Sequence, residues 1–470
     1  MRLLVANGAV VTPEGVQDVD VLCEDGRIAA LLERGLDVAV DEALDVAGKL
    51  VFPGFIDPHV HSRDPGMTEK EDFAHSTLGA LVGGVTTVLE MPNAIPPVDS
   101  LAVFEERRAH HEQSAWVDFG LWGISIGESN IDELPAMIEA GVAAIKIFWG
   151  YALRRDTRQL VYNLSDEPPE NLLMPPDNGV VLRVFETVFR AGGLLAAHCE
   201  DRDILSSSEA ALGHPIETYD DLLAARPDTA EATSIAIAAE FSRTTGCRFH
   251  VVHMASARGA ETVRSAQARG IAVTAETCPQ YLTLTQDDYD RVGPMMKVYP
   301  PIRSSADQAA LWQALNDGVI VSVGSDHAPH TLEEKARGFA TQPAGAVGCE
   351  TFGPVMTDAL TRGKTTPERL AEVLSSSTAR LYGLYPRKGA IRPGSDADLT
   401  VVDPQAHRTV RNEDLVAKQP VSPWNGYELT GVPTAVVLRG EVAMLDGKPV
   451  GERRGRFVPA RHEQATTATS

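Results

Sequence analysis

The sequence predicts an α/β protein in which a (β/α)8 TIM barrel carries a small β-sandwich built from both chain ends. Three observations support this fold class. Apolar, strand-like runs alternate with helix-patterned stretches through the middle of the chain. Both ends contain short strand-like runs separated by turn dipeptides. The length of 470 residues also suits one large barrel plus a smaller domain.

The two chain ends have the same sequence pattern of short apolar runs separated by turns. Near the start, short apolar runs are separated by Asn7-Gly8 and Asp25-Gly26, and further strand-like runs lie at 397–403 and 433–440. We therefore expect residues 1–52 and 391–460 to form one discontinuous sandwich. The barrel should span 53–390, and 461–470 should be a flexible tail.

The middle of the chain supplies the barrel elements. Helices are expected at 257–269 and 305–316, where the pattern is amphipathic. The segment 153–176 is polar and rich in proline, so we interpret it as a loop insertion over the barrel mouth. Buried strands are expected at 51–56, 86–90, 143–148, 193–198, 249–253, 271–275 and 319–323.

Composition and charge exclude several classes of partner. The net charge of −23 argues against nucleic acid and anionic membranes, which require a basic face. No window resembles a transmembrane span, and the first residues do not resemble a signal peptide. The five scattered cysteines lack any CxxC pair, which favours a reducing, cytoplasmic location.

The run 57–66 contains the most informative motif, in which His59 and His61 follow a buried strand. Residues i and i+2 of a strand point the same way, so the two imidazoles can approach one metal ion such as zinc. A surface pair or two hydrogen-bonded core histidines would give the same pattern.

Other candidate ligands recur where strands end. His198 and His253 end two apolar runs, and Asp326 follows a third. In TIM barrels the catalytic groups sit at the carboxyl ends of the strands. Taken singly, each histidine could be an ordinary core residue, and Asp326 could cap a helix. Their common position predicts instead that they meet at one site.

Lys146 is unusual because it lies inside the third apolar run of the barrel region. A buried ammonium group is costly, so the side chain either reaches out to water or becomes neutral and reactive. Reaction of a neutral lysine with carbon dioxide would give a carbamate, an anion able to bridge two cations.

These motifs resemble those of the cyclic amidohydrolases, a group that includes dihydroorotases, hydantoinases or dihydropyrimidinases, and allantoinases. The resemblance spans nearly the whole chain. It covers 53–61, 83–87, 91–93, 146–148, 197–200, 252–256, 276–281, 325–330 and 394–399.

The resemblance implies two zinc ions and a small cyclic amide as substrate. The implied metal ligands are His59, His61, Lys146, His198, His253 and Asp326. Carboxylated Lys146 would bridge the two ions. Asp326 would take a proton from the attacking hydroxide and pass it to the leaving nitrogen. The resemblance also implies a homo-oligomer, either a dimer or a tetramer.

The motifs that select the ring point in two directions. Arg63, Asn93 and His330 resemble the groups with which dihydroorotases bind a substrate carboxylate, although Arg63 could instead pair with Asp64 or Glu69. This set makes dihydroorotate the expected substrate.

Two further features favour a hydantoinase, dihydropyrimidinase or allantoinase. Tyr151 stands five residues after Lys146, where hydantoinases carry a tyrosine that stabilises the oxyanion. The run 278–281 also resembles hydantoinases or allantoinases. Tyr299 replaces an asparagine that family members often carry, which weighs against a dihydroorotate pocket. A non-catalytic scaffold is the alternative of another class, but every implied ligand position is retained.

Overall fold

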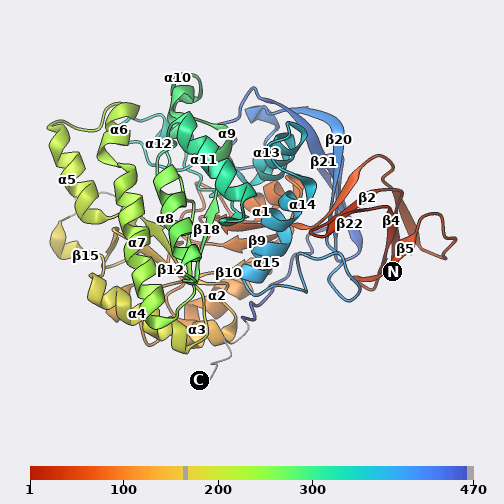
Figure 1. The fold of residues 1–470 in the computed structure, drawn as a ribbon, viewed down its shortest axis with the longest axis horizontal. Coiled ribbons are helices and arrows are strands. Elements are labelled where there is room, and N and C mark those ends of the chain that lie inside the picture. The colour runs from red at the N-terminus through yellow and green to blue at the C-terminus, as the bar shows by residue number, and fades with distance from the viewer. Residues whose placement is uncertain (162–167, 463–470) are drawn as a thin grey trace.

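The structure is a computed structural model that describes residues 1–161 and 168–462. A barrel occupies the body of the molecule, and β-sheets from both chain ends pack at one side of it (Figure 1). None of the helices in the described part of the chain has the length and apolarity needed to cross a membrane. Residues 162–167, which belong to the predicted insertion, and the predicted tail beyond His462 lie outside the described residues.

The barrel strands are parallel and almost completely buried, as expected for strands covered on both faces. The barrel closes where the backbone N–H of His61 donates to the carbonyl of His327, at 2.8 Å. The strands are β8 (Phe55–Val60), β9 (Val85–Glu90), β10 (Asp118–Leu121), β11 (Gly123–Ile124), β12 (Ile145–Trp149), β16 (Leu195–Cys199), β17 (Phe249–Val251), β18 (Val273–Thr277) and β19 (Ile320–Val323).

Helices surround these strands (Figure 1). The longer ones are α1 (Phe73–Val82), α2 (Leu101–His111), α3 (Leu134–Ala140), α4 (Asn178–Arg190), α5 (Arg202–Leu212), α6 (Tyr219–Ala225), α7 (Asp228–Thr245), α8 (Ala257–Ala268), α11 (Ser305–Asn316) and α13 (Cys349–Thr361). Shorter ones are α9 (Pro279–Thr283), α10 (Tyr289–Val292), α12 (Leu332–Lys335), α14 (Pro367–Ala371) and α15 (Ser377–Leu381).

The sequence pattern did not indicate the third barrel strand, which consists of β10 and β11. Asp118, Gly120 and Gly123 interrupt its apolar run, so neither alternation nor a continuous hydrophobic stretch is visible. Lys146 consequently lies on the fourth barrel strand rather than on the third.

Two sheets at the side of the barrel combine both chain ends. One has the order β5-β4-β1-β6 and the other β23-β22-β21-β20-β7-β2-β3. Their shared core includes Val5, Val21, Val51, Val401 and Val437. The strands are β1 (Arg2–Ala6), β2 (Ala9–Thr12), β3 (Gly15–Gln17), β4 (Val19–Glu24), β5 (Arg27–Glu33), β6 (Glu42–Asp45), β7 (Leu50–Pro53), β20 (Leu399–Thr409), β21 (Glu428–Leu438), β22 (Glu441–Leu445) and β23 (Lys448–Pro449).

Antiparallel pairing joins the two ends, because β7 pairs with the start of β20 and Arg27 forms an antiparallel bridge with Asp396. After Pro53 the chain continues through Gly54 directly into β8, the first barrel strand. A side chain at Gly54 would meet Thr86 Oγ1 at 2.2 Å, so only glycine fits this junction.

The predicted loop insertion contains strands in the structure. β13 (Ala152–Arg154) pairs with β14 (Leu160–Val161) and with β15 (Leu172–Leu173). Leu153 and Leu160 form a small apolar cluster with Tyr151, which supplies the local core that the polar composition of the segment concealed.

Candidate metal centre

The predicted ligands meet at the carboxyl ends of the barrel strands. His59 lies near the end of β8 with His61 just beyond it, and His253 and Asp326 follow β17 and β19. His253 and Asp326 have φ values of 40° and 48°, a left-handed conformation that is uncommon outside glycine. Such strained positions cluster at functional sites, where the surrounding structure holds them in place.

The side chains form two adjoining groups. In the first, Asp326 Oδ1 lies 3.3 Å from His59 Nε2 and 3.5 Å from His61 Nε2. In the second, His198 Nδ1 lies 3.2 Å from His253 Nε2. The rings of His59 and His253 are 5.2 Å apart between centroids, so the two groups are neighbours.

Hydrogen bonds on the far side of each ring orient three of these histidines. His59 Nδ1 lies 2.6 Å from Glu276 Oε1, and His198 Nε2 lies 2.8 Å from Glu200 Oε2. His61 Nδ1 donates to the side-chain oxygen of Asn93 at 2.7 Å. An acceptor behind the ring fixes the tautomer and leaves the other nitrogen able to bind a metal.

Glu276 and Glu200 were not assigned a role from the sequence, although both lie in the motifs 276–281 and 197–200 that carried the resemblance. Burial opposes ionisation of Glu276, but hydrogen bonds from His250 and His59 hold its pKa below the ordinary value. It is therefore a permanent anion that accepts hydrogen bonds from both rings.

Burial also sets the protonation of the ligands. It lowers the pKa of His61 to about 4 and lowers the pKa of His198 and His253 as well, so these rings are neutral near pH 7. Burial opposes ionisation of Asp326, yet the neighbouring His59 and His61 lower its pKa below the usual value. Neutral imidazoles and an ionised carboxylate are the forms that bind metal ions.

Lys146 lies at the centre of this chemistry. Its side chain is fully buried, and burial lowers the pKa of the amine to about 8 despite the nearby Glu276 and Asp326 carboxylates. Among the described residues, no hydrogen-bond partner reaches Lys146 Nζ, and the contact of His59 Nε2 with Asp326 Oδ1 at 3.3 Å lacks hydrogen-bond geometry. Buried polar atoms are rarely left unpaired, so the Lys146 amine indicates that a further group completes the site.

The donor set fits a pair of divalent cations. One carboxylate and two imidazoles converge within 4.8 Å of one another at the first position. The imidazoles of His198 and His253 form the second position. The buried amine nitrogen of Lys146 is the remaining candidate ligand atom. Histidine and carboxylate ligands of this kind are typical of catalytic zinc and related metals.

The predicted substrate residues lie around this group. Arg63 is buried and has a φ of 61°. Its Nε donates to the Pro329 carbonyl at 3.1 Å, and its Nη2 lies 3.3 Å from His330 Nε2. Asp64 pairs with His110 instead, and within the described ranges no carboxylate forms an ion pair with Arg63.

Tyr151 belongs to a second buried network. Its hydroxyl lies 3.0 Å from His198 Nε2 and accepts a hydrogen bond from Arg226 at 3.1 Å. Arg226 is ion-paired with Glu200, and its guanidinium group stacks 3.6 Å from the ring centroid of Tyr299. Tyr299, which stands where family members often carry an asparagine, therefore packs against Arg226, the arginine that hydrogen-bonds to Tyr151.

Comparison with known proteins agrees with this geometry. The amidohydrolase family matches residues 50–443. The chain is 34% identical to an allantoinase of Rubrobacter xylanophilus, with 98% of each chain covered. It is also 34% identical to a dihydroorotase of Pelotomaculum thermopropionicum, covering 95% of this chain and 99% of that protein.

A solved structure resembles the whole chain. The L-hydantoinase (dihydropyrimidinase) from Arthrobacter aurescens superposes with a TM-score of 0.90 at 32% identity, covering 97% of this chain and 99% of that one. The protein therefore belongs to the amidohydrolase family, with the predicted barrel and sandwich. Within that family it is a cyclic amidohydrolase of the hydantoinase, allantoinase and dihydroorotase group.

The comparisons correct the order of the predicted substrates. Dihydroorotate was the leading expectation, but allantoinases and hydantoinases outnumber dihydroorotases among the similar relatives. The alternative prediction is therefore the better supported one. Only three residues, Arg63, Asn93 and His330, favour dihydroorotate, whereas the comparison with hydantoinases and allantoinases rests on similarity over nearly the whole chain.

Proposed function

We propose that the protein is a binuclear zinc enzyme that opens the five-membered ureide ring of a hydantoin or of allantoin. The observation that carries the proposal is the position of the Tyr151 hydroxyl, 3.0 Å from the metal-site residue His198. A buried hydroxyl at the edge of the metal group can donate to an oxyanion that develops on a ring carbonyl.

The residues divide the chemistry between them. Metal ions in such a site make hydroxide available near neutral pH and polarise a carbonyl. Asp326 is positioned to take a proton from the nucleophile at Oδ1 and return it to the departing amide nitrogen, which leaves poorly unless protonated. Lys146, carboxylated on its unpaired Nζ, would supply an anion between the two metal positions.

Dihydroorotate is the second candidate because of Arg63. Its buried guanidinium group bonds only to a carbonyl and to His330 among the partners that the structure describes. A substrate carboxylate would satisfy this charge through a bidentate contact. Asn93, the third predicted carboxylate contact, is already hydrogen-bonded to His61, so its contribution to substrate binding stays a prediction.

The test measures the turnover of hydantoin, allantoin and dihydroorotate by the zinc-loaded protein and by three variants, one of which is a control. If Tyr151 stabilises the oxyanion, Tyr151→Phe lowers kcat on every ring by about a hundredfold. Tyr427→Phe removes a hydroxyl that bonds to Arg291 and is the matched control. Faster turnover of dihydroorotate than of both ureides, lost in Arg63→Met, would reject the proposal in favour of the second candidate.

A further inference from the structure

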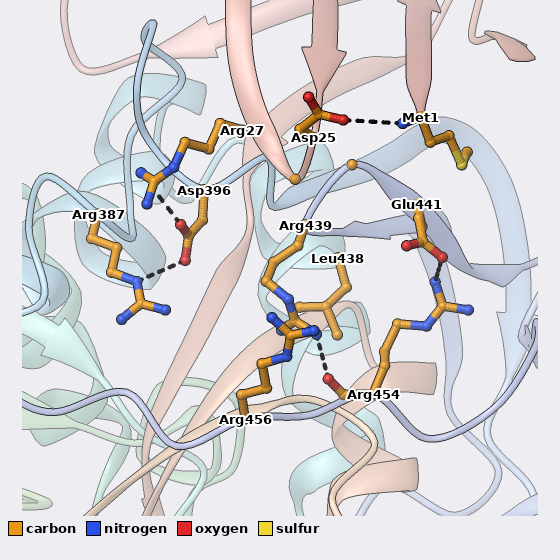
Figure 2. A pocket seen from close by; sticks show the side chains of 12 residues that line it. Met1, Asp25, Arg27, Arg387, Asp396, Leu438, Arg439, Glu441, Arg454 and Arg456 are labelled. Carbon is orange, nitrogen blue, oxygen red and sulfur yellow. Dashed lines mark hydrogen bonds and ion pairs between the residues drawn. The ribbon is translucent and has the colours of Figure 1, made fainter. Parts of the chain in front are cut away.

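A charged cavity separate from the candidate metal centre lies at the junction between the sandwich and the segments that follow the barrel (Figure 2). Its volume is about 360 Å³, within the range of small-molecule sites. The walls come from the turn between β4 and β5, the segment 387–396, the turn between β21 and β22, and the segment 454–456. Five arginines line it, namely Arg27, Arg387, Arg439, Arg454 and Arg456.

The cavity is remote from the metal centre. Arg439 forms an ion pair with Asp118, which begins the barrel strand β10. The metal ligands lie at the carboxyl ends of the parallel strands, so Asp118 and the cavity belong to the opposite end of the barrel. None of the predicted metal or substrate residues lines the cavity.

One wall has fewer carboxylates than cations. Figure 2 shows Arg27 and Arg387 converging on Asp396. Asp396 lies 2.9 Å from Arg387 and 3.8 Å from Arg27, and it also lies 3.1 Å from the buried Lys388. A single carboxylate thus serves three positive groups, and two of them border the cavity.

The other wall also carries an unmatched charge. Arg454 pairs with Glu441 at 2.5 Å, whereas Arg456 is exposed and has no ion pair with any residue that the structure describes. Five arginines and the Met1 amino group, which pairs with Asp25 at 3.2 Å, face three carboxylates in the lining (Asp25, Asp396 and Glu441), an excess of three positive charges. When Lys388, Asp118 and Asp398, which lie beneath the cavity, are added, seven cations face five carboxylates, so the excess remains positive.

We propose that this cavity binds a small molecule that carries a diphosphate group. Guanidinium groups bind phosphate oxygens through paired hydrogen bonds, and arginines on two walls suit two linked anionic groups better than one carboxylate. In a chain with a net charge of −23, a local excess of positive charge is a departure from the average surface. The bound anion would connect the sandwich turns to the segments 387–396 and 454–456.

Calorimetric titration of the metal-loaded full chain tests the proposal, with inorganic pyrophosphate and ADP as separate probes. The expected result is one saturable site in addition to any binding at the metal centre. Affinity should fall at least about tenfold in the Arg387→Ala/Arg456→Ala double variant and weaken with added salt. Tighter binding of ADP would identify a nucleotide as the source of the diphosphate, and equal binding would identify the diphosphate alone.

Controls separate this site from the rest of the molecule. Arg269→Ala removes an exposed arginine at the C-terminal end of α8 that forms no ion pair within the described residues, and the variant should bind both probes like the parent protein. Pyrophosphate also binds metal ions, and the double variant keeps the metal centre, so it measures that background directly. Arg456→Ala alone breaks no ion pair within residues 1–161 and 168–462, so this variant is expected to retain the fold. Equal affinity in the parent and in both cavity variants would overturn the proposal.

Discussion

Lys146 and Lys388 are both buried, but their surroundings shift the pKa values of the two amines in opposite directions. Lys388 lies within 2.5 Å of carboxylate oxygens of both Asp118 and Asp398, and these anions raise its pKa above the ordinary value although burial opposes them. Lys146 has no hydrogen-bond partner among the described residues, and burial lowers its pKa to about 8.

Burial alone does not make a lysine reactive. Lys388 is a fixed cation that holds three carboxylates at the junction of barrel and sandwich. Lys146 faces metal-binding groups with an amine that can lose its proton near neutral pH, which is the form that reacts with carbon dioxide. The number of carboxylates within reach distinguishes a structural lysine from one available for chemistry.

The largest expected effect is the loss of activity when Lys146 is removed. Lys146→Ala is expected to lower cyclic amide hydrolysis by at least about a thousandfold, because the bridging anion and one metal ion are lost with it. Elemental analysis should find fewer than two metal ions per chain, and circular dichroism should show the parent fold. Full activity with two bound ions would refute a bridging role for Lys146.

Removing Lys388 should instead act on stability. Lys388→Met leaves Asp118, Asp396 and Asp398 buried beside one another, and the free energy of unfolding should fall by about 3–5 kcal/mol. Urea unfolding followed by fluorescence measures this. The folded fraction should still bind its metal ions, so a loss of metal without a loss of stability would contradict the division between the two lysines.

The lowered pKa of Lys146 should also make the free energy of unfolding depend on pH. In metal-free protein without carbon dioxide, the pKa of Lys146 is about 8 in the folded state against 10.5 when unfolded. The unfolded chain binds more protons between these values, so stability rises with pH by up to about 3 kcal/mol across this window. The difference between parent and Lys146→Met isolates this effect, because other buried lysines contribute equally to both. A difference that does not change between pH 8 and 10.5 would show that the amine is charged in the fold.

The smallest expected effect concerns the anion behind His59. Glu276→Gln keeps the shape but removes the charge that His59 and His250 contact, and metal affinity should fall by about 10–100-fold. Competition with a chelator measures the affinity. Glu441→Gln, which changes an exposed pair with Arg454, is the matched control. Unchanged metal affinity in Glu276→Gln would mean that a neutral hydrogen-bond acceptor is enough to orient His59.

The sequence was sufficient to predict much of the fold and which side chains come together at the candidate metal centre, whereas their binding of metal stays a prediction. The HxH pattern and the residues at strand ends are local signals, and the structure brings His59, His61, His198, His253 and Asp326 together. The partners behind them depend on folding. Glu276 lies 217 residues from His59, and Arg226 lies 75 residues from Tyr151, so no periodicity in the sequence indicates either contact.

The third barrel strand was missed for a related reason. Asp118 has the polarity of a loop residue, and its burial is possible only because Lys388 and Arg439 reach it from a distant part of the chain. A buried charge and its counter-charge are visible as a pair only in three dimensions.

The pairing of β7 with β20 has a consequence for how the protein is made. The two strands lie about 350 residues apart, and closing so long a loop is slow and costs chain entropy. During synthesis, β7 has no neighbour on that side until residues 399–402 have left the ribosome. A ribosome that stalls within the barrel region would leave an open sheet edge directly attached to the first barrel strand, and open edges invite pairing between chains.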